Sequence, residues 1–415
     1  MPTELREIGL SKNREWFESS EGQREVSGFI DKLRTEVGNP KDYEETCRRA
    51  DLAGAKLTPE TLQEIFTQFE PLTENTPPGH DINHIRRDAL AGLALATGDP
   101  FLKTAFSEAD IQAAILGAVF HDIGTAIFKR YEDNTRPNAH AEIGAYIFWK
   151  TSEGIINEDV RKLAAYAIAA HTHFLKPIPV KEPQGYERQP YWYEIFYPEE
   201  GKPCGLAPII TRFSDRLDVN GASHTVRTMM ANADASETGG QEFAGEAGFF
   251  EINKNSLTAL FYPYVREEKP KPQSALEHTL MFADSNFGNS VYSRDDHLFP
   301  LMGELMKIRA EQIHELIKIV STPPDMMEFD ENRAKSLVKT VMFQISGSKN
   351  LERSWNVLAQ VWDNLNPEVQ ARWVNGFKYI QGSHRSWVLT LKNKVEGEYQ
   401  DFADKLVKMI FPNLG

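Results

Sequence analysis

Cysteines and long apolar segments are scarce in this sequence, and both scarcities narrow the kinds of protein that it can encode. Cys47 and Cys204 are the only cysteines among 415 residues, and they lie far apart without Cys-x-x-Cys spacing. Neither a disulfide framework nor a structural zinc knuckle is therefore indicated. The sequence has no run of about 18 apolar residues, and its first residues are charged rather than apolar. We expect a cytoplasmic protein that has no membrane partner.

Positively charged side chains are also fewer than negatively charged ones in this sequence. The 46 lysines and arginines are outnumbered by 60 aspartates and glutamates, which gives a formal net charge of −14. Nonspecific binding to DNA, RNA or an anionic membrane requires a basic surface. We therefore expect no nonspecific nucleic-acid binding, although a local basic pocket for one phosphate group is compatible with the overall charge.

Alternating strand patterns are almost absent, whereas helical periodicity and helix start signals recur along the chain. Asp81 precedes one helical pattern, and Ser107 with Asp110 resembles a capping box at the start of another. Five helices are predicted in the middle of the chain, over 82–97, 107–122, a segment containing His140 and Ile147, 157–171, and a segment starting near Pro208. The sequence therefore predicts an all-α protein.

Changes in composition divide the chain into three predicted regions. Residues 1–75 form an N-terminal helical region that ends before a proline-rich turn, and residues 76–235 contain the histidine-rich part. Residues 236–415 form a mostly helical C-terminal lobe. Within the middle region, residues 174–207 are an irregular insertion rich in proline and aromatic side chains. This insertion is predicted to be a substrate lid or a subunit contact, and the second alternative would make the protein a homo-oligomer.

The histidines are concentrated in the middle region, where six of the 11 fall between residues 80 and 173. Imidazole and carboxylate side chains that converge from separate helices hold metal ions in a fixed geometry. His121 and Asp122 are adjacent at a predicted helix end, so their side chains point about 100° apart. One carboxylate can then bridge two metals while the neighbouring imidazole binds one of them. With Asp215 further along the chain, the pattern indicates a binuclear metal site.

The order of these residues resembles the HD-domain metal-dependent phosphohydrolase superfamily in its binuclear form. The motifs that carry the resemblance are Asn83-His84-Ile85-Arg86-Arg87, Phe120-His121-Asp122-Ile123-Gly124, His140-Ala141-Glu142-Ile143-Gly144, Ala167-Ile168-Ala169-Ala170-His171 and Phe213-Ser214-Asp215-Arg216-Leu217-Asp218. They occur in the family's order and cover about residues 76–225 of this chain. The resemblance implies an HD-domain helical bundle, flanked here by additional N-terminal and C-terminal helical regions.

What the resemblance implies for the site is a pair of divalent metal ions. The first would be held by His84, His121, Asp122 and Asp215, and the second by Asp122 as a bridge with His140 and His171. His173 is the alternative to His171 as a ligand. His121 and Asp122 are the expected catalytic residues, and the expected substrate contacts are Lys129, Arg87, Arg216, Asp218 and His173. Iron or manganese suits this mixed nitrogen and oxygen set, with zinc, magnesium, cobalt and nickel as alternatives.

Two departures from the family pattern bear on the substrate. Thr125 replaces the lysine that often follows the His-Asp-x-Gly motif, so a phosphate contact would come from Lys129, Arg130 or the insertion. The segment after His171 lacks the Asp-Gly-x-Gly-Tyr-Pro continuation of the cyclic-di-GMP phosphodiesterases, which argues against that substrate.

We expect a phosphohydrolase or phosphodiesterase that uses a bimetallic site to activate water against a phosphoester. Its substrate is expected to be a small phosphorylated molecule, with a nucleotide as the default. The alternatives are a mixed-valent di-iron oxygenase of the same superfamily, cleaving a C–C or C–P bond, and a noncatalytic metal-binding sensor or scaffold. Turnover separates the enzymes from the scaffold, and oxygen consumption separates the two enzymes from each other.

The substitution Asp122→Ala tests the bridging role directly. Because this carboxylate is expected to hold both metals, its removal should abolish metal binding and activity together. Elemental analysis and hydrolysis of bis-p-nitrophenyl phosphate measure the two effects. Full activity in the variant would overturn the assignment.

Overall fold

The computed structural model describes residues 15–73, 76, 79–126, 139–171, 180–181, 187–188, 205–238, 249–250, 274–277, 279–280, 300–326, 329–347 and 351–412. The fold is all-α, as predicted. Over the described residues, the only strands are β1 (Val180–Lys181) and β2 (Glu187–Arg188), which pair antiparallel. Most of the predicted insertion at 174–207 lies outside the described residues. No helix in the described part of the chain is long and apolar enough to cross a membrane.

The chain forms two compact units that are discontinuous in sequence. Unit 1 comprises Met1–Thr76, Asp88–Asp215 and Lys394–Ala403, and unit 2 comprises Pro77–Arg87, Arg216–Asn393 and Asp404–Gly415. The boundaries pass through α6 (Ile82–Gly98) and α12 (Ala207–Val219), each of which is one continuous helix. The three regions expected from composition stay a prediction.

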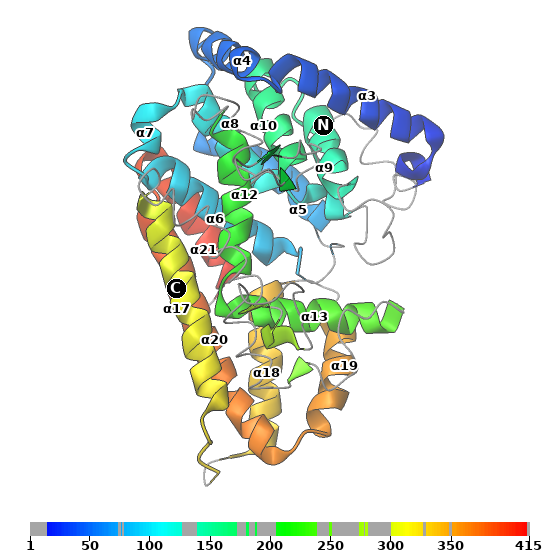
Figure 1. Cartoon of the computed structure of the whole chain (residues 1–415), viewed down its shortest axis with the longest axis vertical. Coiled ribbons are helices and arrows are strands. Elements are labelled where there is room, and N and C mark those ends of the chain that lie inside the picture. Colours follow the sequence, from blue (N-terminus) through cyan, green and yellow to red (C-terminus); the bar gives the residue numbers. More distant parts are fainter. Residues whose placement is uncertain are drawn as a thin grey trace. The chain divides into compact units, whose positions relative to one another are not determined.

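Unit 1 is built around α8, whose residues from Ala109 to Phe120 are buried except for the half-buried Ile111. Most of these residues are apolar, and they lie on every side of the helix. Helix α10 packs against both α8 and α9, and α3 and α4 pack on α10 (Figure 1). The helices that lie wholly in unit 1 are α3 (Ser20–Val37), α4 (Pro40–Leu52), α5 (Pro59–Thr73), α7 (Leu102–Ala105), α8 (Glu108–Phe120), η1 (Ile123–Ala126), α9 (Ala139–Thr151), α10 (Glu158–Ala170) and η4 (Gly397–Tyr399). Helix α21 (Gln400–Ile410) starts in unit 1 and ends in unit 2.

The predicted starts of three helices are confirmed, and a side chain caps each of them. The Ser107 hydroxyl accepts a hydrogen bond from the Asp110 amide at the start of α8, and the Asn157 side chain accepts two amide bonds at the start of α10. The Asp81 carboxylate accepts a bond from the His84 amide, 3.2 Å long, in the first turn of α6. These caps satisfy backbone donors that a helix leaves unpaired, so they fix where each helix begins.

Gly117 lets α8 approach its neighbours closely. A Cβ atom at this position would clash with the Thr211 hydroxyl of α12 and would lie 3.1 Å from the Ala167 methyl of α10. Any larger residue would push α10 and α12 away from α8. Both helices carry candidate metal ligands, so this small residue keeps those ligands near the end of α8.

Asp110 ties α8 to the start of α12 and to α4. Its Oδ1 accepts hydrogen bonds from the Tyr43 hydroxyl at 2.7 Å and from the Ala207 amide at 2.9 Å. Its Oδ2 accepts a bond from the Leu206 amide at 2.7 Å. Burial raises the pKa of Asp110 to about 6, and these hydrogen bonds oppose that rise without cancelling it. Asp110 therefore fixes the start of the helix that carries Asp215.

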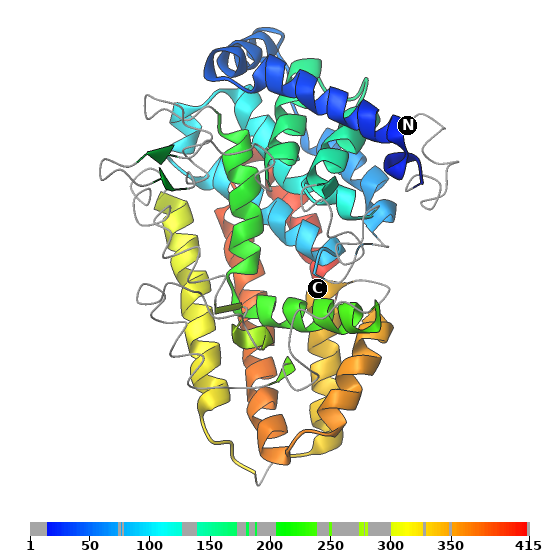
Figure 2. The same ribbon diagram turned by 45° about the vertical axis from the view of Figure 1, so that its right-hand side comes forward.

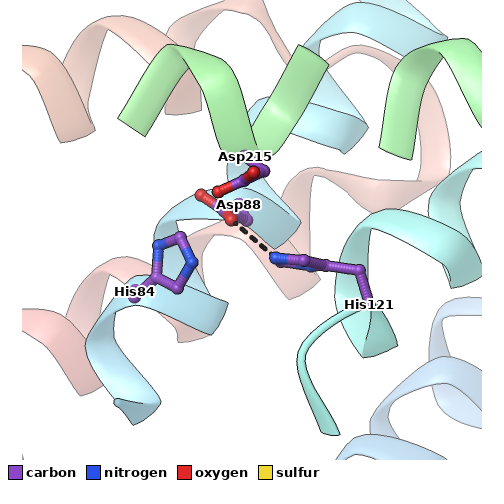
Figure 3. A group of neighbouring side chains, drawn as sticks. All are labelled: His84, Asp88, His121 and Asp215. Atoms are coloured by element: carbon purple, nitrogen blue, oxygen red, sulfur yellow. Dashed lines mark ion pairs between the residues drawn. The ribbon is translucent and has the colours of Figure 1, made fainter. Parts of the chain in front are cut away.

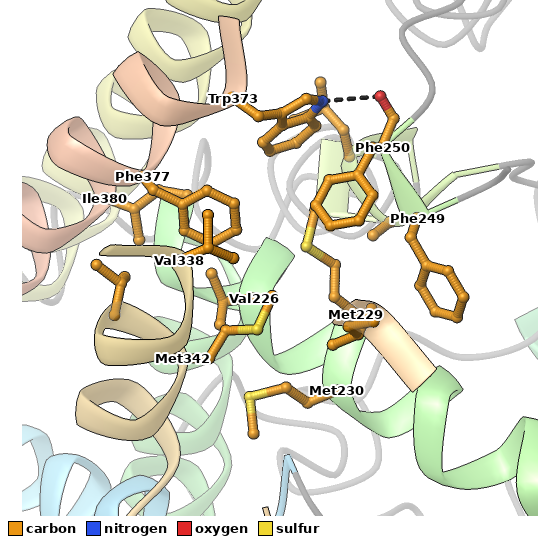
Figure 4. Close-up of a cluster of buried hydrophobic side chains, with 14 of the residues drawn as sticks. Val226, Met229, Met230, Phe249, Phe250, Val338, Met342, Trp373, Phe377 and Ile380 are labelled. Atoms are coloured by element: carbon orange, nitrogen blue, oxygen red, sulfur yellow. Dashed lines mark hydrogen bonds between the residues drawn. The ribbon is translucent and has the colours of Figure 1, made fainter. Parts of the chain in front are cut away.

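Unit 2 has its own apolar core, in which side chains of α13 meet the C-terminal helices (Figure 4). Helix α13 (Ala222–Thr238) lies across α18 (Glu331–Ser346) and α19 (Leu351–Asp363) in both ribbon views (Figures 1 and 2). The remaining long helices are α17 (Pro300–Ser321) and α20 (Pro367–Lys394). The Trp373 indole donates a hydrogen bond of 2.7 Å to the Phe250 carbonyl inside this core.

The substitution Asp110→Asn tests whether the pKa of the buried Asp110 carboxyl group is raised. The pKa of Asp110 is higher in the folded protein than the value of 3.8 for an unperturbed aspartate, so the folded state binds its proton more tightly. The stability contributed by protonation is therefore gained as the pH falls through about 6 and lost as it rises. Between pH 7.5 and pH 5, wild type should gain on the order of 1 kcal/mol in free energy of unfolding relative to the variant.

Urea denaturation of both proteins at the two pH values measures this difference. The raised pKa would be contradicted if the difference in free energy of unfolding between wild type and Asp110→Asn did not change with pH or changed in the opposite direction. Asp99→Asn, at another buried carboxylate of unit 1, is the matched control for the general effect of pH.

Candidate metal centre

Asp122 follows α8 at the turn into η1, and its two carboxylate oxygens face different groups of side chains. Oδ2 lies 3.5 Å from Nε2 of His121. Oδ1 lies 3.6 Å from Nε2 of His171 and 3.8 Å from Nε2 of His140. The carboxylate is buried and stands between the two groups, which is the position expected of a bridging ligand.

The first group consists of Asp122, His140 and His171. Their ligand atoms all lie within 4.8 Å of one another. His140 comes from the first turn of α9, and His171 caps the C-terminus of α10. The His140 side chain is 19% exposed, whereas those of His171 and Asp122 are 2% and 3% exposed. This group is therefore open to solvent on the side of His140.

The second group contains Asp88 from α6, His121 from the end of α8 and Asp215 from α12 (Figure 3). Each offers a ligand atom, and these atoms also lie within 4.8 Å of one another. Nε2 of His121 is 3.2 Å from Oδ2 of Asp88. His84 lies one turn before Asp88 on the same continuous helix, and it offers a fourth ligand atom to the group.

Three of these histidines have their Nδ1 atoms held by acceptors. The contacts are His121 Nδ1 to the Ala118 carbonyl at 3.0 Å, His171 Nδ1 to the Ile168 carbonyl at 2.6 Å, and His84 Nδ1 to Asp218 Oδ2 at 2.9 Å. Carbonyl and carboxylate oxygens only accept hydrogen bonds, so each Nδ1 must carry the proton and donate. In a neutral ring the lone pair then lies on Nε2, which is the atom available to a metal.

This tautomer makes the site suited to a cation. Nε2 of His121 faces an Asp88 oxygen, and Nε2 of His171 faces an Asp122 oxygen. Two acceptors that face each other in a buried site repel unless a positive charge lies between them. Neutral imidazole nitrogens and carboxylate oxygens together are the donor set of divalent transition metals. The residues present therefore fit a pair of divalent ions.

Asp218 orients the ring of His84 through the hydrogen bond from its Nδ1 atom. Its carboxylate accepts two hydrogen bonds from Arg87, at 2.7 and 2.9 Å, and one of 2.7 Å from Arg227. Burial alone would raise the pKa of Asp218, but the two guanidinium groups and the bond from His84 outweigh it and hold the pKa well below its usual range. A carboxylate that stays ionised keeps the His84 proton on Nδ1.

Two further contacts position the ligands of the first group. Arg212 of α12 donates a hydrogen bond to the backbone carbonyl of His171 and so fixes the end of α10. A Cβ atom at Gly124 would clash with the His140 carbonyl, so only glycine lets η1 approach the first turn of α9 this closely. The glycine of the His-Asp-x-Gly motif thus brings Asp122 near His140.

The structure brings together all six predicted metal ligands: His84, His121, Asp122, His140, His171 and Asp215. Arg87 and Asp218, predicted as substrate contacts, are buried and bonded to each other. Arg216 is half-buried beside Asp215 on α12. Lys129 and His173 lie outside the described residues. The individual roles of these residues stay predictions.

Asp88 is a member of the site that the sequence analysis missed. It follows His84 by four residues, so both side chains lie on one face of α6. A carboxylate one turn after a candidate histidine ligand, at the start of the apolar second half of α6, is the signal that could have found it.

Comparison with known families agrees with this geometry. The family model of the HD domain matches residues 82–220. Residues 82–220 are an HD domain. The matched segment runs from the start of α6 to just beyond α12, so it contains every residue of the two groups. The HD domain belongs to a superfamily of metal-dependent phosphohydrolases. No curated protein and no solved structure matches the chain.

The substitution Asp88→Asn tests whether this carboxylate belongs to the metal centre. The variant keeps the size of the side chain and removes a negative charge, so metal content should fall from about two to about one ion per chain. Elemental analysis after dialysis measures the loss. Asp99→Asn, which changes a buried carboxylate at the start of α7, should keep the wild-type metal content. Equal metal content in the Asp88 variant and wild type would contradict the assignment.

Proposed function

We propose that the HD domain is a phosphohydrolase or phosphodiesterase that activates water against a phosphoester with two divalent metal ions. The observation that carries this proposal is the position of Asp122. One of its oxygens faces His121, and the other faces His140 and His171. A carboxylate shared in this way suits a pair of metals better than a single one.

The residues divide between the two ions according to the two groups. The ion of the second group, called the inner ion, would be held by Asp88, His121, Asp215 and His84. The ion of the first group, called the outer ion, would be held by His140 and His171, and Asp122 stands between the two groups. Iron or manganese suits this donor set, in which nitrogen and oxygen ligands are mixed. Bound divalent ions would lower the pKa of a water molecule and neutralise charge on a phosphoryl oxygen.

The balance of charge favours a phosphate substrate. The carboxylates of Asp88, Asp122 and Asp215 supply three negative charges, and the imidazoles are neutral when they act as ligands. Two divalent ions supply four positive charges, so the loaded site has an excess of one positive charge. The single carboxylate of Asp218 is paired with the guanidinium groups of Arg87 and Arg227, so these three side chains together add one further positive charge. An anionic phosphoester would therefore be attracted to the loaded site.

The substrate would enter the site on the side of His140. His140 is more exposed than His121 and His171. A phosphoester that approaches on this side would meet the group of His140 first. Three of the four residues of the other group are buried, and Asp215 is half-buried. We propose a small phosphorylated substrate, with a nucleotide as the default.

Metal analysis and turnover measured on one preparation test this proposal. The protein, purified under anaerobic and aerobic conditions, should contain about two iron or manganese ions per chain. It should cleave bis-p-nitrophenyl phosphate, lose this activity to a chelator and regain it with added metal. His171→Ala should lower both metal content and activity, whereas His314→Ala, at an exposed position on α17, should retain both.

Oxygen uptake in the same preparation distinguishes the two chemistries that this donor set can support. Uptake that depends on substrate, with two iron ions and no phosphoester cleavage, would replace the hydrolase with a di-iron oxygenase. Metal near zero under both conditions would exclude both enzymes.

A further inference from the structure

Arg309 of α17 is a charged side chain in the interior of unit 2. The same helix places Ile313, Leu316 and Val320 in the apolar core of this unit, and Arg309 itself is 0% exposed. Removing a guanidinium group from water costs free energy unless the groups around it compensate for the lost hydration. The partners that compensate for the buried charge therefore indicate what Arg309 does.

The guanidinium group of Arg309 binds the end of α12. Nε donates a hydrogen bond of 2.8 Å to the Leu217 carbonyl, and Nη2 donates one of 2.8 Å to the Asp218 carbonyl. Carbonyl groups in the last turn of a helix lack partners within the helix and carry the negative end of its dipole. Nη2 also lies 3.9 Å from Oδ1 of Asp218. The cation therefore caps α12 at the residue whose carboxylate orients His84.

Arg309 also binds the start of α13, which follows α12 after only two residues. Its Nη2 donates a hydrogen bond of 3.1 Å to the Ser223 hydroxyl in the first turn of α13. Arg227 lies one turn after Ser223 and donates a bond of 2.7 Å to the Asp218 carboxylate. Arg309 thus holds both helices that meet at Asp218: α12, which carries this carboxylate, and α13, which carries Arg227.

The surroundings of Arg309 fix its own position. Nη1 donates a hydrogen bond of 2.8 Å to Oε1 of Gln312, and Cζ lies 4.6 Å from the centre of the Trp387 ring on α20. A Cβ atom at Gly221 would clash with Cζ of Arg309. Because the φ angle of Gly221 is not positive, the space for the guanidinium group is what requires glycine at this position.

We propose that Arg309 is a positioning residue of the metal centre, and that it acts by holding Asp218 against His84. This inference rests on the proposed function, because it needs a metal ion beside His84. Asp218 accepts the Nδ1 proton of His84 at 2.9 Å, which leaves Nε2 for the metal. Arg309, Asp218 and His84 all belong to unit 2. Without Arg309 the end of α12 would lose its cap, and the ring of His84 would lose its fixed orientation.

The substitution Arg309→Met removes the guanidinium group and keeps an unbranched side chain. Equilibrium dialysis against Mn²⁺, followed by elemental analysis, measures metal affinity without turnover. Wild type should bind about two Mn²⁺ ions per chain. The variant should bind one of them about tenfold more weakly and the other with unchanged affinity, because only the inner ion contacts His84. Gly221→Ala displaces the guanidinium group without removing it and should have the same effect, so it provides the same comparison if Arg309→Met does not fold.

The same substitution in the His84→Ala protein distinguishes positioning from a general loss of stability. If Arg309 acts through His84, adding Arg309→Met to His84→Ala should leave the Mn²⁺ affinity of the single variant unchanged. Leu316→Ala is the matched control, because it removes apolar contacts of the same helix α17 from the core of unit 2. It should lower the melting temperature and retain the Mn²⁺ affinity of wild type.

The outcomes separate this inference from the proposed function. Unchanged Mn²⁺ affinity in Arg309→Met, or an equal further loss of affinity in the His84→Ala protein, would overturn the positioning role and leave the hydrolase standing. Weaker binding of one ion in Arg309→Met, in a protein that cleaves no bis-p-nitrophenyl phosphate, would support the positioning role and contradict the hydrolase. Absence of Mn²⁺ binding by wild type would overturn both.

Discussion

The carboxylates of Asp88, Asp122 and Asp215 come together with imidazole rings near the end of α8, and the HD domain depends on keeping them there. Like charges that share a buried site repel, and removing charges from water costs free energy as well. A pair of cations resolves both problems at once, because each carboxylate then has a positive partner. His121 and His171 suit the same cations, because each donates its Nδ1 proton to a fixed backbone carbonyl and its Nε2 atom faces a carboxylate of the site.

Contacts away from the site hold the elements that present these groups. Asp110 fixes the start of α12, which carries Asp215, and Arg212 fixes the end of α10, which carries His171. Gly124 allows η1 to touch α9, and the ion pairs of Asp218 fix the ring of His84. These contacts are side-chain hydrogen bonds, ion pairs and one close backbone approach, and each joins two different elements. Ligands held in this way lose little freedom when a metal binds, which favours tight binding.

Local signals predicted much of this arrangement. Ser107 marked the start of α8, the helix starting near Asn157 was expected, and the His121-Asp122 pair marked the end of α8. Such features depend on neighbours within one turn, so they can be recognised from sequence. Asp88 lies one turn after His84, but this local position does not fix its role, because the role depends on which face of α6 turns toward His121.

The predicted substrate contacts show a further limit of sequence reasoning. Arg87 and Asp218 are polar residues next to candidate ligands, a pattern equally typical of substrate contacts and of side chains that orient ligands. The structure pairs them with each other and with His84, which favours orientation. Sequence spacing alone does not distinguish these roles, because both need a charged group close to the metal.

Anomalous diffraction from crystals of the metal-loaded protein, recorded at the iron and manganese absorption edges, tests the central claim most directly. Two anomalous peaks per chain are predicted, one bounded by Asp88, His121 and Asp215 and the other by His140 and His171, with Asp122 contacting both. A single peak, two peaks that do not share Asp122, or no peak within these groups would contradict a binuclear centre.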